Sequence, residues 1–180
     1  MNLSFNTQRL NVIELNSNDT KSERTTLVNA LPAILTPAVV ANLPSYFQGV
    51  DSIAAAEKWL VNMLNECCLL MLQSQHQEVI GLLFVYTEKH DAHIGYLLAE
   101  QYWGQGLAFE LLQGFINLAC THSYWRKLIA GVDELNRPSI KLLKNWLLKN
   151  KLQRKMECCF MNLTYTKIVS EMNKYDLQTS

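Results

Sequence analysis

The sequence predicts a mixed α/β fold in which antiparallel strands are followed by a long helical crossover. Two apolar runs, residues 67–73 and 79–86, are separated by five polar residues, which is typical of an antiparallel hairpin. A third run, His93–Leu98, ends at a glycine-containing turn, and a helical apolar stripe follows it. The 180 residues are enough for one domain with a full core, and we expect a single domain over residues 1–180.

The N-terminal part is predicted to begin with a short strand over Thr7–Leu15. Helical pieces follow, and we expect them to be broken at Pro32, Pro37 and Pro44, because proline removes a hydrogen-bond donor and disfavours helix before it. Ser52 is a suitable N-cap for the next helix. The apolar face of that helix is predicted to consist of Ile53, Ala56, Leu60, Met63 and Leu64.

The C-terminal part continues the alternation of helix and strand. A strand is expected at Leu128–Val132, then a helix with Pro138 in its first turn. Met156–Leu163 and Tyr165–Val169 are typical of strands, and we predict a terminal hairpin that turns through residues 162–164. The helix after the glycine turn has its apolar stripe at Leu107, Ala108, Leu111, Leu112, Phe115, Ile116 and Ala119.

The central stretch of the chain is Gly95–Glu110, which reads as a strand, a tight turn and the first turn of a helix. Gly104 and Gly106 have access to backbone angles that are closed to other residues, and they let a ligand approach the main chain closely. The first N–H groups of the helix point into that space, where they favour an anion such as a diphosphate.

Two familiar glycine turns do not fit this stretch. A Walker A loop requires Gly-Lys-Ser/Thr, but Gly106 is followed by Leu107 and Ala108. A dinucleotide fingerprint requires glycine or alanine where Phe109 stands, and it requires a parallel βαβ unit rather than the predicted hairpin. An ordinary strand-to-helix turn with two glycines remains as the alternative.

The segment Gln101-Tyr102-Trp103-Gly104-Gln105-Gly106 resembles the Gln/Arg-x-x-Gly-x-Gly/Ala acetyl-CoA signature of the general N-acetyltransferase (GNAT) superfamily. The wider string Tyr-Trp-Gly-Gln-Gly-Leu-Ala-x-Glu is most similar to the RimJ/RimL branch, which contains the ribosomal-protein N-terminal acetyltransferases. Asn136-x-x-Ser139 with the Leu142-Leu143 pair resembles a second family motif. The chain departs from the family at Leu147-Leu148, where a Gly-Phe pair is usual, so we expect this helix to run on.

This resemblance implies a mixed, mostly antiparallel sheet of about seven strands, flanked by helices and splayed between strands 4 and 5. It implies that the pantetheine arm of acetyl-CoA lies in the splay, against the strand edge at Leu97, Leu98 and Ala99. The diphosphate would bind the N–H groups of residues 103–108, and Trp103 would either flank it or pack in the core. The expected coenzyme-binding residues are Leu97, Leu98, Ala99, Gln101, Trp103, Gly104, Gln105, Gly106, Leu107, Ala108, Asn136 and Ser139.

The resemblance also implies catalytic candidates. Ser139 matches the family serine that donates toward the coenzyme sulfur, although Asn136 and Ser139 also have the residue types of helix caps. Glu100 and Glu157 are candidate general bases without a matching motif, and each has the alternative of being a surface carboxylate. Glu110 is better suited to complement the helix dipole. Asp133 and Glu134 are expected at the mouth of the cleft, where they would attract a cationic amine.

Three functions agree with these features. The first is an acetyl-CoA-dependent N-acetyltransferase that acts on a primary amine, above all on the N-terminus of a ribosomal or other protein. The second is an enzyme for a small amine such as a polyamine, an amino acid or an aminoglycoside, with a pocket closed by Tyr46 and Phe47. The third is a coenzyme-binding module without catalysis.

Composition and sequence pattern bear on the partners, the location and the metal content of the protein. The formal net charge is zero and no block of like charge occurs, so neither nucleic acid nor a membrane surface is an expected partner. The N-terminus has no signal-peptide pattern, and we expect a cytoplasmic protein. Five cysteines occur without a Cys-x-x-Cys spacing, and no histidine stands at ligand spacing from them, so we expect no metal site.

Overall fold

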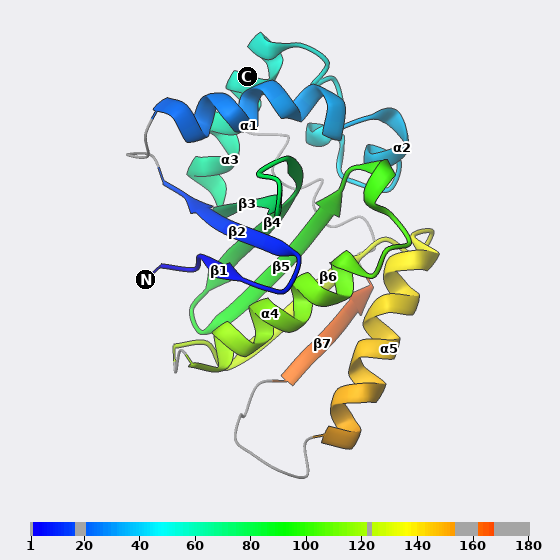
Figure 1. Cartoon of the computed structure of the whole chain (residues 1–180). Coiled ribbons are helices and arrows are strands. Elements are labelled where there is room, and N and C mark those ends of the chain that lie inside the picture. The colour runs from blue at the N-terminus through cyan, green and yellow to red at the C-terminus, as the bar shows by residue number, and fades with distance from the viewer. Residues whose placement is uncertain (1, 17–20, 122–123, 154–161, 168–180) are drawn as a thin grey trace.

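The computed structural model describes residues 2–16, 21–121, 124–153 and 162–167. These residues form one sheet with helices packed around it (Figure 1). In chain order the elements are β1 (Phe5–Asn6), β2 (Leu10–Leu15), α1 (Lys21–Ile34), α2 (Pro37–Val40), the 3-10 turn η1 (Ser45–Phe47), α3 (Ile53–Glu66), β3 (Cys68–Ser74), β4 (Val79–Glu88), β5 (Asp91–Leu98), the 3-10 turn η2 (Glu100–Tyr102), α4 (Leu107–Thr121), β6 (Lys127–Val132), α5 (Arg137–Gln153) and β7 (Asn162–Lys167).

The strands lie in the sheet in the order in which they occur in the chain. Neighbours from β1 to β5 are antiparallel, whereas β5, β6 and β7 are mutually parallel. The predicted mixed, mostly antiparallel sheet is therefore confirmed. Six strands have six to ten residues each, and β1 has only two, so the expected number of about seven is reached only when β1 is counted.

The sheet opens along β5. This strand pairs with β4 from Asp91 to Leu98, but its described pairs with β6 run only from Asp91 to Ile94. Residues 95–98 therefore have a partner strand on one side and an open edge on the other. This is the splay predicted between the fourth and fifth strands of the sequence, which are β5 and β6 of the structure.

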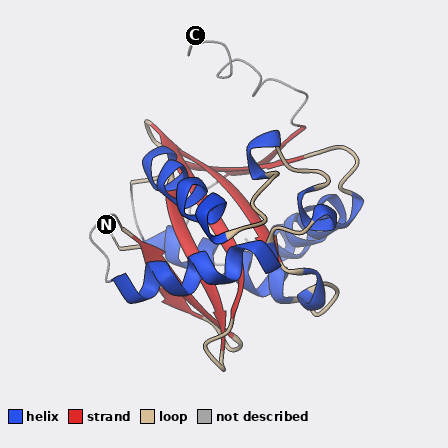
Figure 2. Ribbon diagram, turned by 90° about the horizontal axis from the view of Figure 1, so that it is seen from above, coloured by secondary structure: helices blue, strands red, loops and turns tan. Residues whose placement is uncertain are grey.

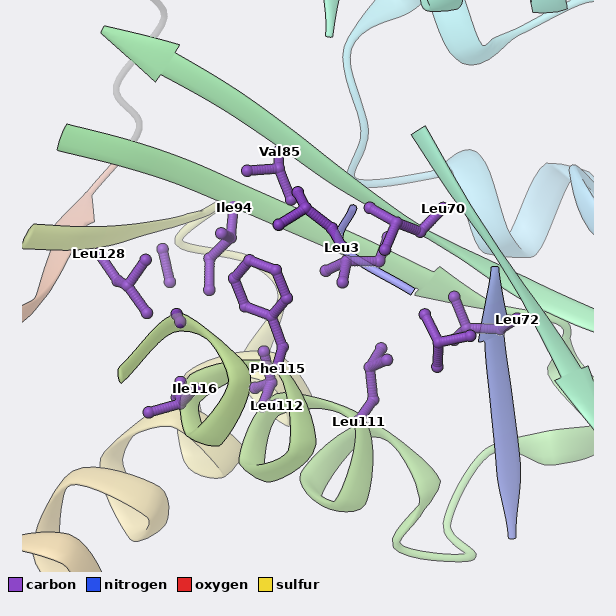
Figure 3. Packing of buried hydrophobic residues seen from close by; sticks show 14 of the residues in the cluster. Leu3, Leu70, Leu72, Val85, Ile94, Leu111, Leu112, Phe115, Ile116 and Leu128 are labelled. Carbon is purple, nitrogen blue, oxygen red and sulfur yellow. The ribbon is translucent and has the colours of Figure 1, made fainter. Parts of the chain in front are cut away.

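Helices lie on both faces of the sheet, as the view from above shows (Figure 2), and an apolar core covers each face. One core joins α1 and α3 to the face that carries Leu82 and Leu97. The other joins α4 to the opposite face, where Phe115 points from the helix toward the strands that carry Val85 and Ile94 (Figure 3). The predicted α4 stripe is buried at every position except Ala108, which is half-buried.

Three details of the N-terminal part differ from the sequence prediction. Pro32 lies inside α1 and does not break it, because the helix is near its end and Leu35 still donates to the Leu31 carbonyl (2.8 Å). The first long strand begins at Leu10 rather than Thr7, because Thr7 bonds back to the Leu10 carbonyl (2.8 Å) in a turn. Ser52 caps α3 as expected, but Ile53 is exposed.

The C-terminal elements contain one confirmed and one wrong prediction. With no glycine at 147–148, α5 runs on to Gln153, as expected. The predicted hairpin turn at 162–164 is wrong, because these residues belong to β7, a single strand parallel to β6. Alternating threonine and tyrosine favour a strand there. No helix in the described part of the chain combines the length and apolar character that crossing a membrane requires.

Candidate active site

The glycine turn lies at the carboxyl end of β5, beside the open edge of the sheet. Gly104 and Gly106 adopt positive φ angles of 72° and 77°, which only glycine adopts without strain. A side chain added at Gly104 would meet no atom within 4 Å, so the main chain of the turn is accessible to a ligand. The Glu110 N–H donates to the Gly106 carbonyl (3.1 Å), which makes Gly106 the N-cap of α4. The N–H groups of Leu107 and Ala108 consequently have no intrahelical acceptor.

Thr7 and Arg9 of the N-terminal segment hold the glycine turn in place. Glu110 Oε1 accepts hydrogen bonds from Thr7 Oγ1 (2.6 Å) and from the Arg9 backbone N–H (2.7 Å). Arg9 Nε lies 2.7 Å from Glu110 Oε2, and Arg9 Nη1 donates to the Gln105 carbonyl (2.9 Å). Burial raises the pKa of Glu110, but the hydrogen bonds and charge of Thr7 and Arg9 outweigh it and lower the pKa overall. The sequence had suggested a helix-dipole role for Glu110, and the structure adds that it anchors the turn.

Most of the predicted loop residues are presented to solvent. Trp103 is half exposed, which excludes the core-packing alternative, and its Nε1–H donates to the Leu98 carbonyl (2.7 Å). Tyr102 donates to Glu78 Oε2 (2.6 Å), and Gln105 donates to the Gln101 carbonyl (2.7 Å). Of the predicted loop set, Gln101, Trp103, Gly104, Gln105 and Gly106 are exposed, Ala108 is half-buried and Leu107 is buried.

The strand register shows which backbone groups of β5 face β4 and which face the open edge. Ala99 N–H donates to the Ile80 carbonyl on the β4 side (2.9 Å). Because backbone groups alternate along a strand, those of Leu97 also face β4, whereas those of Tyr96 and Leu98 face the open edge. The resemblance predicts residues 97–99 at this edge. Tyr96 is not predicted, because the sequence does not show which backbone groups of the strand face β4.

The first turn of α5 closes the other side of this opening. Asn136 Oδ1 accepts the Ser139 N–H (3.1 Å), and the Asn136 carbonyl accepts the Ile140 N–H (3.0 Å), so Asn136 caps the helix as its residue type suggested. The Ser139 hydroxyl is not part of the cap. It accepts a hydrogen bond from the Tyr96 hydroxyl (3.3 Å), which joins α5 to β5 across the splay.

The carboxylates of the region have different environments. Glu100 is exposed at the start of η2 and accepts a hydrogen bond from Thr36 Oγ1, the N-cap of α2. Asp133 Oδ1 accepts the Leu135 N–H (2.8 Å) within the β6–α5 turn, and Glu134 is exposed in the same turn. Glu157, the other proposed base, lies outside the described residues.

Cys67 and Cys68, at the start of β3, do not have the character of nucleophiles. Burial raises the pKa of Cys67 to about 11, and it also raises the pKa of Cys68. Both thiols are therefore protonated at neutral pH. Within the described part of the chain, no group of three or more histidine, cysteine, aspartate or glutamate residues is placed to hold a metal ion.

An open hollow of about 350 Å³ lies between the start of α4 and α5. It is lined by Phe109, Pro138, Lys141, Leu142 and Asn145. The hollow offers an aromatic ring, an amide and an ammonium group close in sequence to the glycine turn and to Asn136. Lys141 was not among the predicted site residues, because a lysine on a helix is usually a solvated surface charge.

The sequence of this chain matches the model of the acetyltransferase (GNAT) domain over residues 26–146. This range includes the open strand, the glycine turn and the α5 cap. The chain belongs to the GNAT acetyltransferase family.

Similar proteins agree with this family. An uncharacterized N-acetyltransferase p20 from Bacillus licheniformis is 31% identical over 96 residues, which are 48% of this chain and 54% of that protein, so the match spans about half of the curated relative. The structure of RimL, a ribosomal L7/L12 α-N-protein acetyltransferase in complex with coenzyme A, has a TM-score of 0.62 at 19% identity and covers 78% of this chain and 80% of its own. The microcin C7 self-immunity acetyltransferase MccE, in complex with acetyl-CoA and AMP, has a TM-score of 0.62 at 10% identity, over 77% of this chain and 78% of its own.

Proposed function

We propose that the protein is an acetyl-CoA-dependent N-acetyltransferase that acts on a primary amine, with a protein N-terminus as the acceptor. The observation that carries this proposal is the convergence of three features at the carboxyl end of β5. These are the accessible turn at Gly104 and Gly106, the edge of residues 95–98 that faces away from β4 and has no described strand partner, and the α5 cap formed by Asn136. An anionic, extended cosubstrate with amides in its middle fits this combination of groups.

The residues can be assigned to parts of the cosubstrate. The main chain of residues 103–108 would hold the diphosphate, and the open-edge groups of Tyr96 and Leu98 would pair with the pantetheine amides. Trp103 already donates to the Leu98 carbonyl, so the Leu98 N–H and the Tyr96 groups are left for this pairing. The hollow beside Phe109 and Lys141 would take the adenosine 3′-phosphate end, where an ammonium group favours a phosphate.

Acetyl-CoA supplies an acetyl group that is already activated as a thioester. The chain would then act mainly by positioning, which supplies roughly 7 to 11 kcal/mol of barrier reduction in favourable cases. Ser139 would present its hydroxyl proton toward the sulfur, and the N-terminus of α5 would favour the negative charge that develops there. Glu100 would accept the amine proton, directly or through water, while Thr36 holds its carboxylate. Glu157 remains the alternative base.

A protein N-terminus is favoured as the acceptor because residues 131–132 of β6 pair with β7 but have no described pairing with β5, which leaves a second strand edge in the splay for an extended peptide. The exposed carboxylate of Glu134 would attract its ammonium group. A small amine is the second candidate. Tyr46 is 46% exposed, and its ring lies 4.7 Å from that of Phe47, which is buried in the core, so Tyr46 is the member of this pair that could close a small pocket.

The test compares acceptors at a fixed acetyl-CoA concentration. Short peptides with a free N-terminus should be acetylated at least as well as the corresponding single amino acids. Peptides with a blocked N-terminus and an internal lysine should be inert. Acetylation of polyamines or aminoglycosides with inert peptides would transfer the proposal to the small-amine class. Binding of acetyl-CoA without turnover on any amine would favour a coenzyme-binding module.

A further inference from the structure

Tyr96 has a special place in the sheet. It lies two residues beyond Ile94, the last residue of β5 that pairs with β6. Its side chain faces the α4 and α5 side, because Ile94 and Leu98 belong to that core while Leu97 belongs to the opposite one. The phenol ring therefore enters the gap that the splay leaves between β5 and the start of α5.

Ser139 meets this ring from α5. The Asn136 cap fixes the Ser139 backbone, and the Tyr96 hydroxyl donates to Ser139 Oγ at 3.3 Å. A serine hydroxyl has one hydrogen and two lone pairs, and its hydrogen rotates to suit its surroundings. Because Tyr96 donates into one lone pair, the Ser139 hydrogen is directed away from Tyr96.

We propose that Tyr96 is a positioning residue, which holds the Ser139 hydroxyl so that its hydrogen points to the acetyl-donor sulfur in the splay. This inference rests on the proposed function. As the carbon–nitrogen bond forms and the carbon–sulfur bond breaks, the electron pair of the latter remains on sulfur. Ser139 donates its hydrogen bond to that charge, and the amine proton passes to the general base.

The ionisation of Tyr96 suits a donor. Burial raises the pKa of Tyr96, so the phenol keeps its proton at neutral pH and has it available for the hydrogen bond to Ser139 Oγ. Tyr96 is therefore not the source of the proton that neutralises the product. Its contribution is to remove the wrong orientations of the Ser139 hydroxyl, as a supporting residue does for a group in contact with substrate.

The first experiment compares Y96F with wild type. Phenylalanine keeps the ring and removes only the hydroxyl, so the fold is retained. We expect kcat to fall about tenfold, the usual size of one lost hydrogen bond, with the KM for acetyl-CoA changed less than about twofold. Y86F is the control, because Tyr86 is 52% exposed on β4. The S139A and S139A/Y96F enzymes should have the same kcat, since Tyr96 acts only through Ser139.

A second readout does not depend on turnover. The pH dependence of the coenzyme A dissociation constant gives the thiol pKa in the complex, by linkage. The thiol pKa of coenzyme A should be lower in the complex with the wild-type enzyme than in free coenzyme A. In the complexes with Y96F and S139A it should be closer to the value of free coenzyme A. A wild-type pKa and kcat in Y96F would overturn the inference and leave the proposed function intact. Additive effects of the two substitutions on kcat in S139A/Y96F would also overturn it. If wild type binds coenzyme A but acetylates no amine, the proposed function fails, and the thiol pKa still decides whether Tyr96 orients Ser139.

Discussion

Arg9 Nε and Glu110 Oε2 lie 2.7 Å apart, although 101 positions of the chain separate the two residues. The ion pair connects the turn before β2 with the first turn of α4. Since Arg9 also donates to the Gln105 carbonyl, the same side chain holds the glycine turn in place. The conformation of the glycine turn is thus determined partly by the N-terminal segment.

The first prediction follows from this anchor. E110A removes the acceptor of Thr7 and of the Arg9 backbone, and since water can reach these donors, the loss should cost about 1 kcal/mol of unfolding free energy. It should also weaken acetyl-CoA binding several-fold. Urea unfolding and calorimetry measure both effects. Glu57 is exposed on α3, and E57A is the matched control. Equal stability and affinity in the two variants would show that the anchor is unimportant.

The second prediction concerns the stability of the protein at acidic pH. The pKa of Glu110 is lowered from the ordinary value of 4.5, so its contribution to stability is present above that value and is lost as the pH falls through the lower, folded-state pKa. The difference in melting temperature between wild type and E110Q should therefore be greatest near neutral pH and shrink below about pH 4.5. Melting curves over this range measure it, and a difference that grows in acid would contradict the assigned direction.

The third prediction uses two glycines of adjacent strands. A methyl group at Gly81 of β4 would lie 2.3 Å from the Leu97 carbonyl oxygen, whereas one at Gly95 of β5 would find its nearest neighbour, Phe84, at 3.9 Å. G81A should destabilise the fold by about 3 kcal/mol, because backbone must move to relieve the contact. G95A should change stability by less than about 0.5 kcal/mol. Similar urea midpoints for the two variants would refute this account of β4–β5 packing.

The fourth prediction separates capping from catalysis in α5. N136A should cost about 1 kcal/mol of stability, because Asn136 supplies the cap, and N136D should restore most of it. S139A keeps the cap and loses the hydrogen bond from Tyr96, so it should cost no more than about 1 kcal/mol of stability, but it should lower kcat by roughly ten- to ten-thousandfold, as for other groups that act on a proton in the transition state. Denaturation and steady-state kinetics test both residues. An S139A enzyme with unchanged kcat would remove Ser139 from the mechanism.

Local patterns predicted much of the fold. The α4 stripe, the Ser52 cap and the hairpin of β3 and β4 each depend on neighbours in sequence, and the structure confirms them. The prediction of a terminal hairpin is wrong because it depends on which strand the segment pairs with. In the structure β7 pairs with β6 as a parallel strand. No turn signal in residues 162–164 distinguishes the two arrangements.

The same distinction between local and long-range features applies to the candidate site. The two glycines and the Asn136 cap were readable, because each is a local backbone requirement. The contact between Tyr96 and Ser139 was not, since it joins residues 43 positions apart and depends on the strand register. The Arg9 anchor was likewise hidden by its long separation from Glu110.

The most direct test of coenzyme binding is the melting temperature with and without acetyl-CoA. A ligand that binds only the native state adds about 2.7 kcal/mol of stability at a hundredfold excess over its dissociation constant. Wild type should show the corresponding shift, and G106V should lose it, because valine at a φ of 77° would distort the turn. Gly49 has a φ of 71° with no neighbour within 4 Å of an added side chain, so G49V imposes the same strain outside the turn and should keep the shift. The absence of any shift in wild type at millimolar acetyl-CoA would contradict the account.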